Sequence, residues 1–262
     1  MITAPMPALL GLGFVTDFLD TLGIGSFATT TAAFVQGRLV DDGDIPGTLN
    51  VGHAVPTMSE AIIYIILLGG LIDVPTIVSM VLAGGLGAWL GSGVVVHWPR
   101  QTIQRAMAIA LLITAGLMTM RMVADLSLGA GTTGLAGTAL IIAVLASVLI
   151  GSLTSLGIGN YAPTMAVTYM LGMNAKAVFP IMAASAAVIL PVAAIRFYRS
   201  GRFNRRVALG LTLGGLPGVF VAAFLVKELP LDVVKWVVVV VLLYTSVSLW
   251  MSSRKTTENA SA

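Results

Sequence analysis

The chain has 262 residues, of which 57% are hydrophobic and only 10% are charged, and its mean hydropathy is +0.99. An ordinary soluble domain carries about 25% charged residues, so this composition excludes such a domain and indicates a protein of the lipid bilayer. The sequence has no cysteine, which excludes disulfides and thiolate metal sites, and its net charge of +3 matters less than the positions of its basic residues.

The N-terminal region predicts a helix hairpin that does not cross the bilayer as one helix. It lacks the basic segment of a cleavable signal peptide, so we expect it to be retained. Apolar residues 7–22 form the first arm, the chain breaks at Gly23 and Gly25, and residues 27–36 form the second arm. Glycine readily adopts the backbone conformations that end a helix.

Several apolar runs have the length of about 20 residues that a helix needs to span a bilayer core. The first run, residues 47–72, also contains His53 and Glu60. The others, in chain order, are residues 74–96, 106–120, 177–195, 207–226 and 236–251. The polar residues 252–262 predict a disordered tail.

A second hairpin is predicted between these runs. Residues 126–175 contain no Asp, Glu, Lys, Arg or His, and a continuous helix of that length, about 75 Å, is more than twice the thickness of the hydrocarbon core. Residues 135–153 could span the core, whereas residues 161–171 reach about halfway. We therefore expect a re-entrant hairpin with Gly157 and Gly159 at its tip.

The two hairpin tips share a ten-residue motif, found at residues 21–30 (TLGIGSFATT) and, 134 positions later, at residues 155–164 (SLGIGNYAPT). Helix-breaking glycines at matching places in two halves of a membrane protein point to a transporter binding site. With two hairpin arms and three spans per half, the halves insert in opposite orientations. We therefore predict an all-α polytopic membrane protein with two inverted repeats, residues 1–128 and 129–251, in one integral-membrane domain.

The distribution of basic residues favours hairpins over single crossings, because basic side chains gather on cytoplasmic loops. If both glycine-containing regions are hairpins, ten of the fourteen basic residues lie on the cytoplasmic side and four on the outer side. If each region instead crosses the membrane once, the numbers are eight and six. The ten are Arg38, Arg100, Arg105, Arg196, Arg199, Arg202, Arg205, Arg206, Arg254 and Lys255, and the four are Arg121, Lys176, Lys227 and Lys235.

The broken helices predict an anion site. Short helices that begin at the breaks would direct free N–H groups and positive dipole ends into a cavity. Hydroxyl and amide groups add neutral donors, although they could instead satisfy the carbonyl groups of the broken helices. The predicted substrate-binding residues are Thr21, Gly23, Gly25, Ser26, Thr29, Thr30, Ser155, Gly157, Gly159, Asn160 and Thr164.

Four ionisable residues are expected at membrane depth, where their cost makes a functional role the default hypothesis. They are Asp17, Asp20, His53 and Glu60, and the second half has Gly151, Thr154, Ala187 and Ala194 at the matching positions. We interpret the repeated glycine-containing segments as the substrate-binding site and the ionisable residues, which occur only in the first half, as a proton-coupling site. Glu60 or Asp20 would carry the proton, and His53 would tune the proton affinity of that carboxylate. A structural ion pair or hydrogen bond is the alternative.

Signals for catalysis are weak. The sequence contains no His-Glu-x-x-His, no Gly-x-Ser-x-Gly and no phosphate-binding loop, and His53 and His97 alone cannot form a three-histidine zinc site. We expect no enzyme activity, no metal, no cofactor and no nucleic-acid partner.

The repeated Leu-Gly-Ile-Gly break, followed in each half by a Gly-Gly span at Gly84–Gly85 and Gly214–Gly215, resembles the TauE/SafE family of sulfite and organosulfonate exporters. The resemblance implies a multi-pass inner-membrane permease that exports a small sulfur oxyanion by alternating access. Proton coupling is the expected energy source. The alternatives are an uptake permease for another oxyanion or carboxylate, and a membrane scaffold without transport activity.

Overall fold

The computed structural model describes residues 4–68, 73–123 and 132–225, together with residues 240, 243, 246, 247, 250 and 251. The described residues form helices without a β-strand. In chain order these helices are α1 (Met6–Thr21), α2 (Ser26–Gly37), the short 3-10 helix η1 (Asp42–Asp44), α3 (Ile45–Leu68), α4 (Val74–Val95), α5 (Arg100–Val123), α6 (Gly137–Thr154), α7 (Tyr161–Met170), α8 (Ala175–Ser200) and α9 (Arg205–Leu225).

The predicted helices and breaks are confirmed across the described residues. The first break separates α1 from α2, and the second separates α6 from α7. The predicted run at residues 236–251 lies mostly outside the described residues, and the tail at residues 252–262 lies wholly outside them. Four stretches are long and apolar enough to cross a bilayer: Val74–Val95, Gly137–Thr154, Ala177–Ser200 and Arg205–Phe224.

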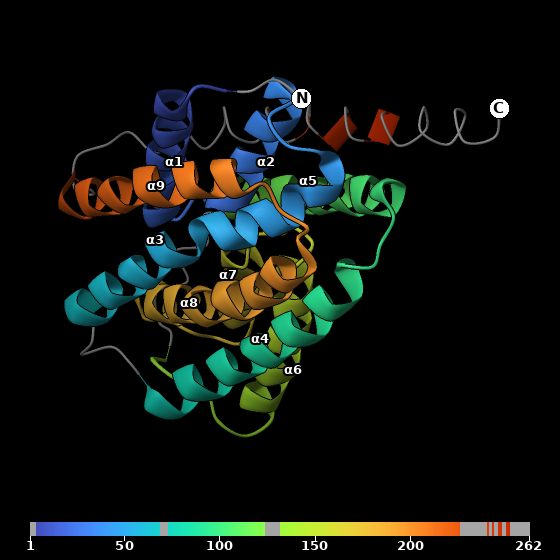
Figure 1. Cartoon of the computed structure of the whole chain (residues 1–262). Coiled ribbons are helices and arrows are strands. Elements are labelled where there is room, and N and C mark those ends of the chain that lie inside the picture. The colour runs from blue at the N-terminus through green and yellow to red at the C-terminus, as the bar shows by residue number, and fades with distance from the viewer. Residues whose placement is uncertain are drawn as a thin grey trace.

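The long helices pack in a paired arrangement (Figure 1). Helix α1 packs against α9, and α6 packs against α4. Between these pairs, α3 packs against α8, while α3 also contacts α9 and α8 also contacts α4. The apolar core is therefore built mainly from α3, α4, α8 and α9, with the short helices α2 and α7 joined to it at the breaks.

Glycines allow the α1–α9 and α4–α6 pairs to approach closely. A Cβ added at Gly87 in α4 would collide with the carbonyl oxygen of Val148 in α6, and one added at Gly214 in α9 would collide with that of Leu10 in α1. Such contacts are typical of membrane helices, whose association depends on close packing of small residues. These glycines therefore serve helix packing.

Polar contacts fix the two ends of α4. At its C-terminal end, the Arg202 guanidinium donates to the carbonyl oxygens of Val96 at 3.1 Å and Gly43 at 3.0 Å, and it pairs with Asp44 at 3.4 Å. Burial raises the pKa of Asp44 above its usual value, and the positive charge of Arg202 opposes that rise. The segment after α2 and the loop between α8 and α9 therefore meet at the C-terminal end of α4.

The opposite end of α4 contacts the second hairpin. The hydroxyl of Thr76 in the first turn of α4 accepts the N–H of Leu135 at 2.8 Å. Thr132, just before Leu135, exchanges backbone hydrogen bonds with the segment after α7, donating to Gly172 at 3.0 Å and accepting from Asn174 at 2.9 Å. Both ends of the second hairpin thus lie together, at the N-terminal end of α4.

Candidate anion site between the two helix breaks

The two breaks have the same backbone hydrogen bonds, 134 residues apart. In the first, the N–H groups of Gly23 and Ile24 donate to the carbonyls of Asp20 and Leu19 at 2.7 and 3.1 Å. In the second, Gly157 and Ile158 donate to Thr154 and Leu153 at 3.0 and 3.3 Å. Gly23 and Gly157 both have positive φ, +79° and +102°, which side chains other than glycine rarely tolerate. The repeated motif therefore forms the same turn twice, at Gly23 and at Gly157.

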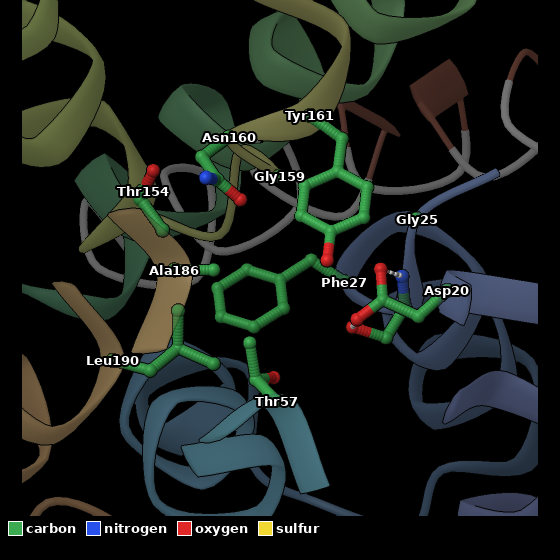
Figure 2. A pocket seen from close by; sticks show the side chains of 11 residues that line it. Asp20, Gly25, Phe27, Thr57, Thr154, Gly159, Asn160, Tyr161, Ala186 and Leu190 are labelled. Atoms are coloured by element: carbon green, nitrogen blue, oxygen red, sulfur yellow. Dashed lines mark hydrogen bonds between the residues drawn. The ribbon is translucent and has the colours of Figure 1, made fainter. Parts of the chain in front are cut away.

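The two breaks lie on either side of one small cavity (Figure 2). The first contributes Gly25, Ser26 and Phe27, and the second contributes Gly159, Asn160 and Tyr161. The remaining lining residues are Asp20, Thr57, Thr154, Ala186 and Leu190. The cavity volume of about 20 Å³ has room for about one water molecule, so the two breaks are closely apposed in this conformation.

Asp20 occupies the donors at the start of α2. Its Oδ1 accepts the N–H of Ser26 at 2.9 Å, and its Oδ2 accepts the Ser26 hydroxyl at 2.9 Å. Asp20 and Ser26 are both buried. One backbone N–H of this helix end and the Ser26 hydroxyl are therefore bonded to a carboxylate of the same chain.

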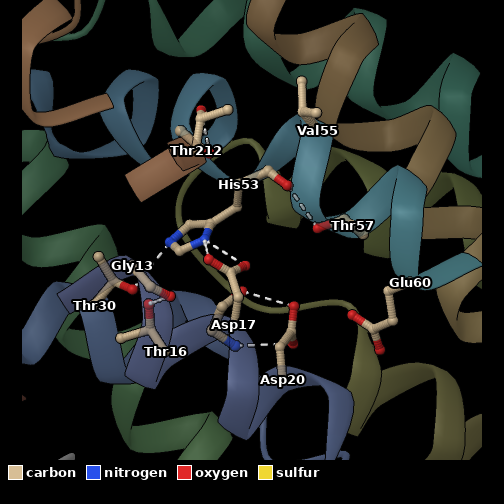
Figure 3. A network of polar contacts seen from close by, with 12 residues as sticks. Gly13, Thr16, Asp17, Asp20, Thr30, His53, Val55, Thr57, Glu60 and Thr212 are labelled. Atoms are coloured by element: carbon tan, nitrogen blue, oxygen red, sulfur yellow. Dashed lines mark hydrogen bonds and ion pairs between the residues drawn. The ribbon is translucent and has the colours of Figure 1, made fainter. Parts of the chain in front are cut away.

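Asp17, His53 and Thr30 form a second buried network (Figure 3). The Nδ1 atom of His53 lies 2.9 and 3.0 Å from the two carboxylate oxygens of Asp17, and its Nε2 atom lies 3.0 Å from the Thr30 hydroxyl. The His53 side chain is fully buried. This network connects α1, α2 and α3, and it gives His53 partners other than Glu60.

Glu60 instead contacts the second break. The Tyr161 hydroxyl, at the start of α7, donates to Oε1 of Glu60 at 2.6 Å. The other carboxylate oxygen of Glu60 is buried and has no hydrogen-bond partner among the described residues. Figure 3 shows the Glu60 carboxylate directed toward Asp20. Because Tyr161 lines the cavity, its hydroxyl connects Glu60 to it.

The structure places only part of the predicted substrate set at this cavity. Gly25, Ser26, Gly159 and Asn160 line it. The hydroxyls of Thr21 and Thr29 donate to nearby carbonyls of their own hairpin, and Ser155 donates to Ala88 in α4, as expected under the alternative interpretation. Gly23, Thr30, Gly157 and Thr164 do not line it either: Thr30 bonds His53, Gly23 faces Phe179, Gly157 faces Met107, and Thr164 is buried in α7.

Sequence reasoning missed the aromatic and small residues of the cavity. Phe27 and Tyr161 occupy equivalent positions in the repeated motif, and this equivalence could have identified them as site residues. Thr57, Ala186 and Leu190 come from α3 and α8 and have no such signal, because their position depends on how those helices pack. No group of three His, Asp or Glu side chains that could hold a metal occurs among the described residues.

Apolar helices long enough to cross a bilayer, together with a small cavity between two broken helices, are features of a membrane transporter. A family model described as sulfite exporter TauE/SafE matches residues 129–262, just over half of the chain. The chain therefore belongs to the TauE/SafE family of membrane transporters. Comparisons with curated proteins and with solved structures gave no match.

Proposed function

We propose that this protein exports a small sulfur oxyanion, sulfite or an organosulfonate, across the inner membrane and binds it between the two helix breaks. One observation carries the proposal: a single cavity is lined by Ser26 from one break and by Asn160 and Tyr161 from the other. The family match, which names sulfite export, independently supports the substrate class.

The lining of the cavity suits an anion with an apolar part. The helix starts at Ser26 and Tyr161 supply backbone donors and positive dipole ends. The ring of Phe27 and the side chain of Leu190 lie beside these groups (Figure 2). An organosulfonate needs both surfaces, because the sulfur atom that carries its charged oxygens is also bonded to an apolar carbon group.

The packing supports an inverted repeat and alternating access. Exchanging α1 with α6, α3 with α8 and α4 with α9 reproduces the observed helix contacts. The segment after α2 lies at one end of α4, and the segment after α7 lies at the other. The 22 residues of α4 extend about 33 Å, the thickness of a bilayer core. A cavity that admits about one water must widen for sulfite, and separation of the two hairpins would widen it.

The acidic residues support proton coupling. Asp17, Asp20, His53 and Glu60 are all buried, and because burial of ionisable groups is costly in a membrane protein, a functional role is the default hypothesis for them. Glu60 contacts the cavity through Tyr161, and Asp20 lines it. We assign proton transfer to Glu60 or Asp20, with the His53–Asp17 pair setting the local field.

Flux measurements test this function. The purified protein in proteoliposomes should transport labelled sulfite, sulfoacetate or taurine, and an imposed proton gradient should accelerate transport. Flux of a carboxylate or another oxyanion alone would favour an uptake permease. Absence of flux for every small anion, with the protein folded in the vesicles, would contradict the proposal and favour the scaffold.

A further inference from the structure

The first helix break already holds an anion that belongs to the protein. The carboxylate of Asp20 accepts both the backbone N–H and the hydroxyl of Ser26, each at 2.9 Å. These donors lie at the start of α2 and border the cavity, so an oxyanion bound there would use the same groups. Asp20 therefore occupies the position that the proposed substrate needs.

The second break lacks this arrangement. Thr154 stands at the position that matches Asp20, and its hydroxyl donates to the carbonyl of Ile150 at 2.8 Å. The amide of Asn160, which matches Ser26, donates to the carbonyl of Met182 at 3.0 Å. An internal carboxylate on these matched positions is thus present only in the first break.

We propose that Asp20 and the transported anion compete for the donors of Ser26, so that the anion binds only after Asp20 has taken up a proton. This inference rests on the proposed function. Two negative charges on one pair of buried donors repel each other with little screening by water. Protonation converts the carboxylate into a neutral acid, and its oxygens then hold the Ser26 donors only weakly. One proton is therefore taken up for each anion that binds.

The surroundings of Asp20 favour it over the other acids for this role. Asp17 is paired with His53, and Glu60 contacts the cavity only through the Tyr161 hydroxyl. Asp20 is the acidic residue that lines the cavity itself. The titratable groups that interact with Asp20 electrostatically are Asp17 on α1, His53, Glu60 and Tyr64 on α3, and Tyr161 on α7.

Calorimetric titration of the purified full-length protein tests the proposal. Ethanesulfonate is the probe, because its charge does not change between pH 5 and 9, unlike that of sulfite. Binding heats measured in buffers of different ionisation enthalpy give the number of protons taken up. Wild type should take up about one proton per anion where Asp20 is ionised, and its affinity should rise up to about tenfold for each unit fall in pH. In Asp20→Asn, uptake should vanish and the affinity should become independent of pH.

The chain offers a matched control. Asp73 caps α4 in the same manner, accepting the N–H and the hydroxyl of Thr76 at 3.0 and 2.6 Å, and it does not line the cavity. Asp73→Asn should therefore keep the proton uptake of wild type.

The wild-type measurement alone can overturn the proposal, even if Asp20→Asn does not fold. Anion binding without proton uptake in wild type would refute the competition and leave the transport function standing. Uptake that persists in Asp20→Asn but disappears in Glu60→Gln would transfer the role to Glu60 and also refute it. If neither ethanesulfonate nor sulfite binds at any pH, the proposed site fails and the inference fails with it.

Discussion

Glu60 has one carboxylate oxygen bonded to Tyr161 and one without a partner among the described residues. If Glu60 carries the coupled proton, Glu60→Gln should reduce gradient-driven transport by at least about tenfold, because an amide cannot exchange the proton, whereas substrate exchange should persist. Flux driven by a pH gradient, compared with exchange in the same vesicles, measures both. Wild-type gradient-driven flux in Glu60→Gln would remove Glu60 from the coupling mechanism.

Tyr161 provides a test of the contact between the second break and α3. Tyr161→Phe leaves the buried Glu60 carboxyl without its hydrogen bond, which should lower the free energy of unfolding by about 1–3 kcal/mol. Tyr198→Phe is the control, since Tyr198 is 64% exposed. Thermal unfolding of both variants in the same detergent provides the comparison, and equal stability of the two would show that the hydrogen bond contributes little.

At the scale of single residues, the sequence predicted the break glycines and the buried acids but not their partners. Gly23, Gly25 and Gly157 were predictable because their positive φ is a local requirement that selects glycine. The pairs Asp17–His53 and Tyr161–Glu60 join residues 36 and 101 positions apart. Such pairs depend on how α1 and α7 are positioned relative to α3, which local sequence pattern does not specify.

The broken helices are the elements on which the site depends. A side chain at Gly159 would point toward Phe27, and a Cβ there would lie 3.9 Å from the Cβ of Phe27. Gly159→Leu should therefore fill the cavity and abolish anion binding while the protein remains folded. Gly159→Ala is the matched control, because its single added carbon makes an ordinary contact. Calorimetric titration measures the anion affinity of each variant, and size-exclusion chromatography shows whether the variant remains folded. Wild-type affinity in Gly159→Leu would show that this glycine serves helix packing only.

The first break responds differently to the same substitution. Gly25 has φ +100°, a conformation that costs other residues about 1–3 kcal/mol. Gly25→Leu should therefore lower stability as well as binding, whereas Gly159→Leu should lower binding alone. Thermal unfolding distinguishes the two, and equal melting temperatures would contradict the backbone assignment.

The helix boundaries were predictable because long uncharged runs, interrupted by glycine, carry the signal for membrane helices. The pairing of α6 with α4 was not predictable, since the surfaces of these two helices are apolar nearly all round. The pairing of α1 with α9 also depends on glycines that contact a neighbouring backbone, such as Gly214.

We propose an inverted topology for the whole molecule, in which the segments after α2 and after α7 lie on opposite sides of the membrane. Arg38 and Gly172 lie in these segments, 134 residues apart, and both are exposed. Because the chain has no cysteine, Arg38→Cys and Gly172→Cys each introduce a single thiol. An impermeant thiol reagent should label one and spare the other in intact cells. Equal labelling of both would overturn the inverted repeat.

The transported anion is proposed to bind between the two helix breaks, and its protection of a single cysteine from alkylation tests this position. Ala186 lines the cavity from α8, so Ala186→Cys places a thiol beside the proposed site. A transported sulfonate should slow alkylation of this thiol in proportion to its occupancy and leave alkylation of Arg38→Cys unchanged. Equal alkylation rates of Ala186→Cys with and without saturating sulfonate, in protein that still transports it, would show that the anion does not bind between the two breaks.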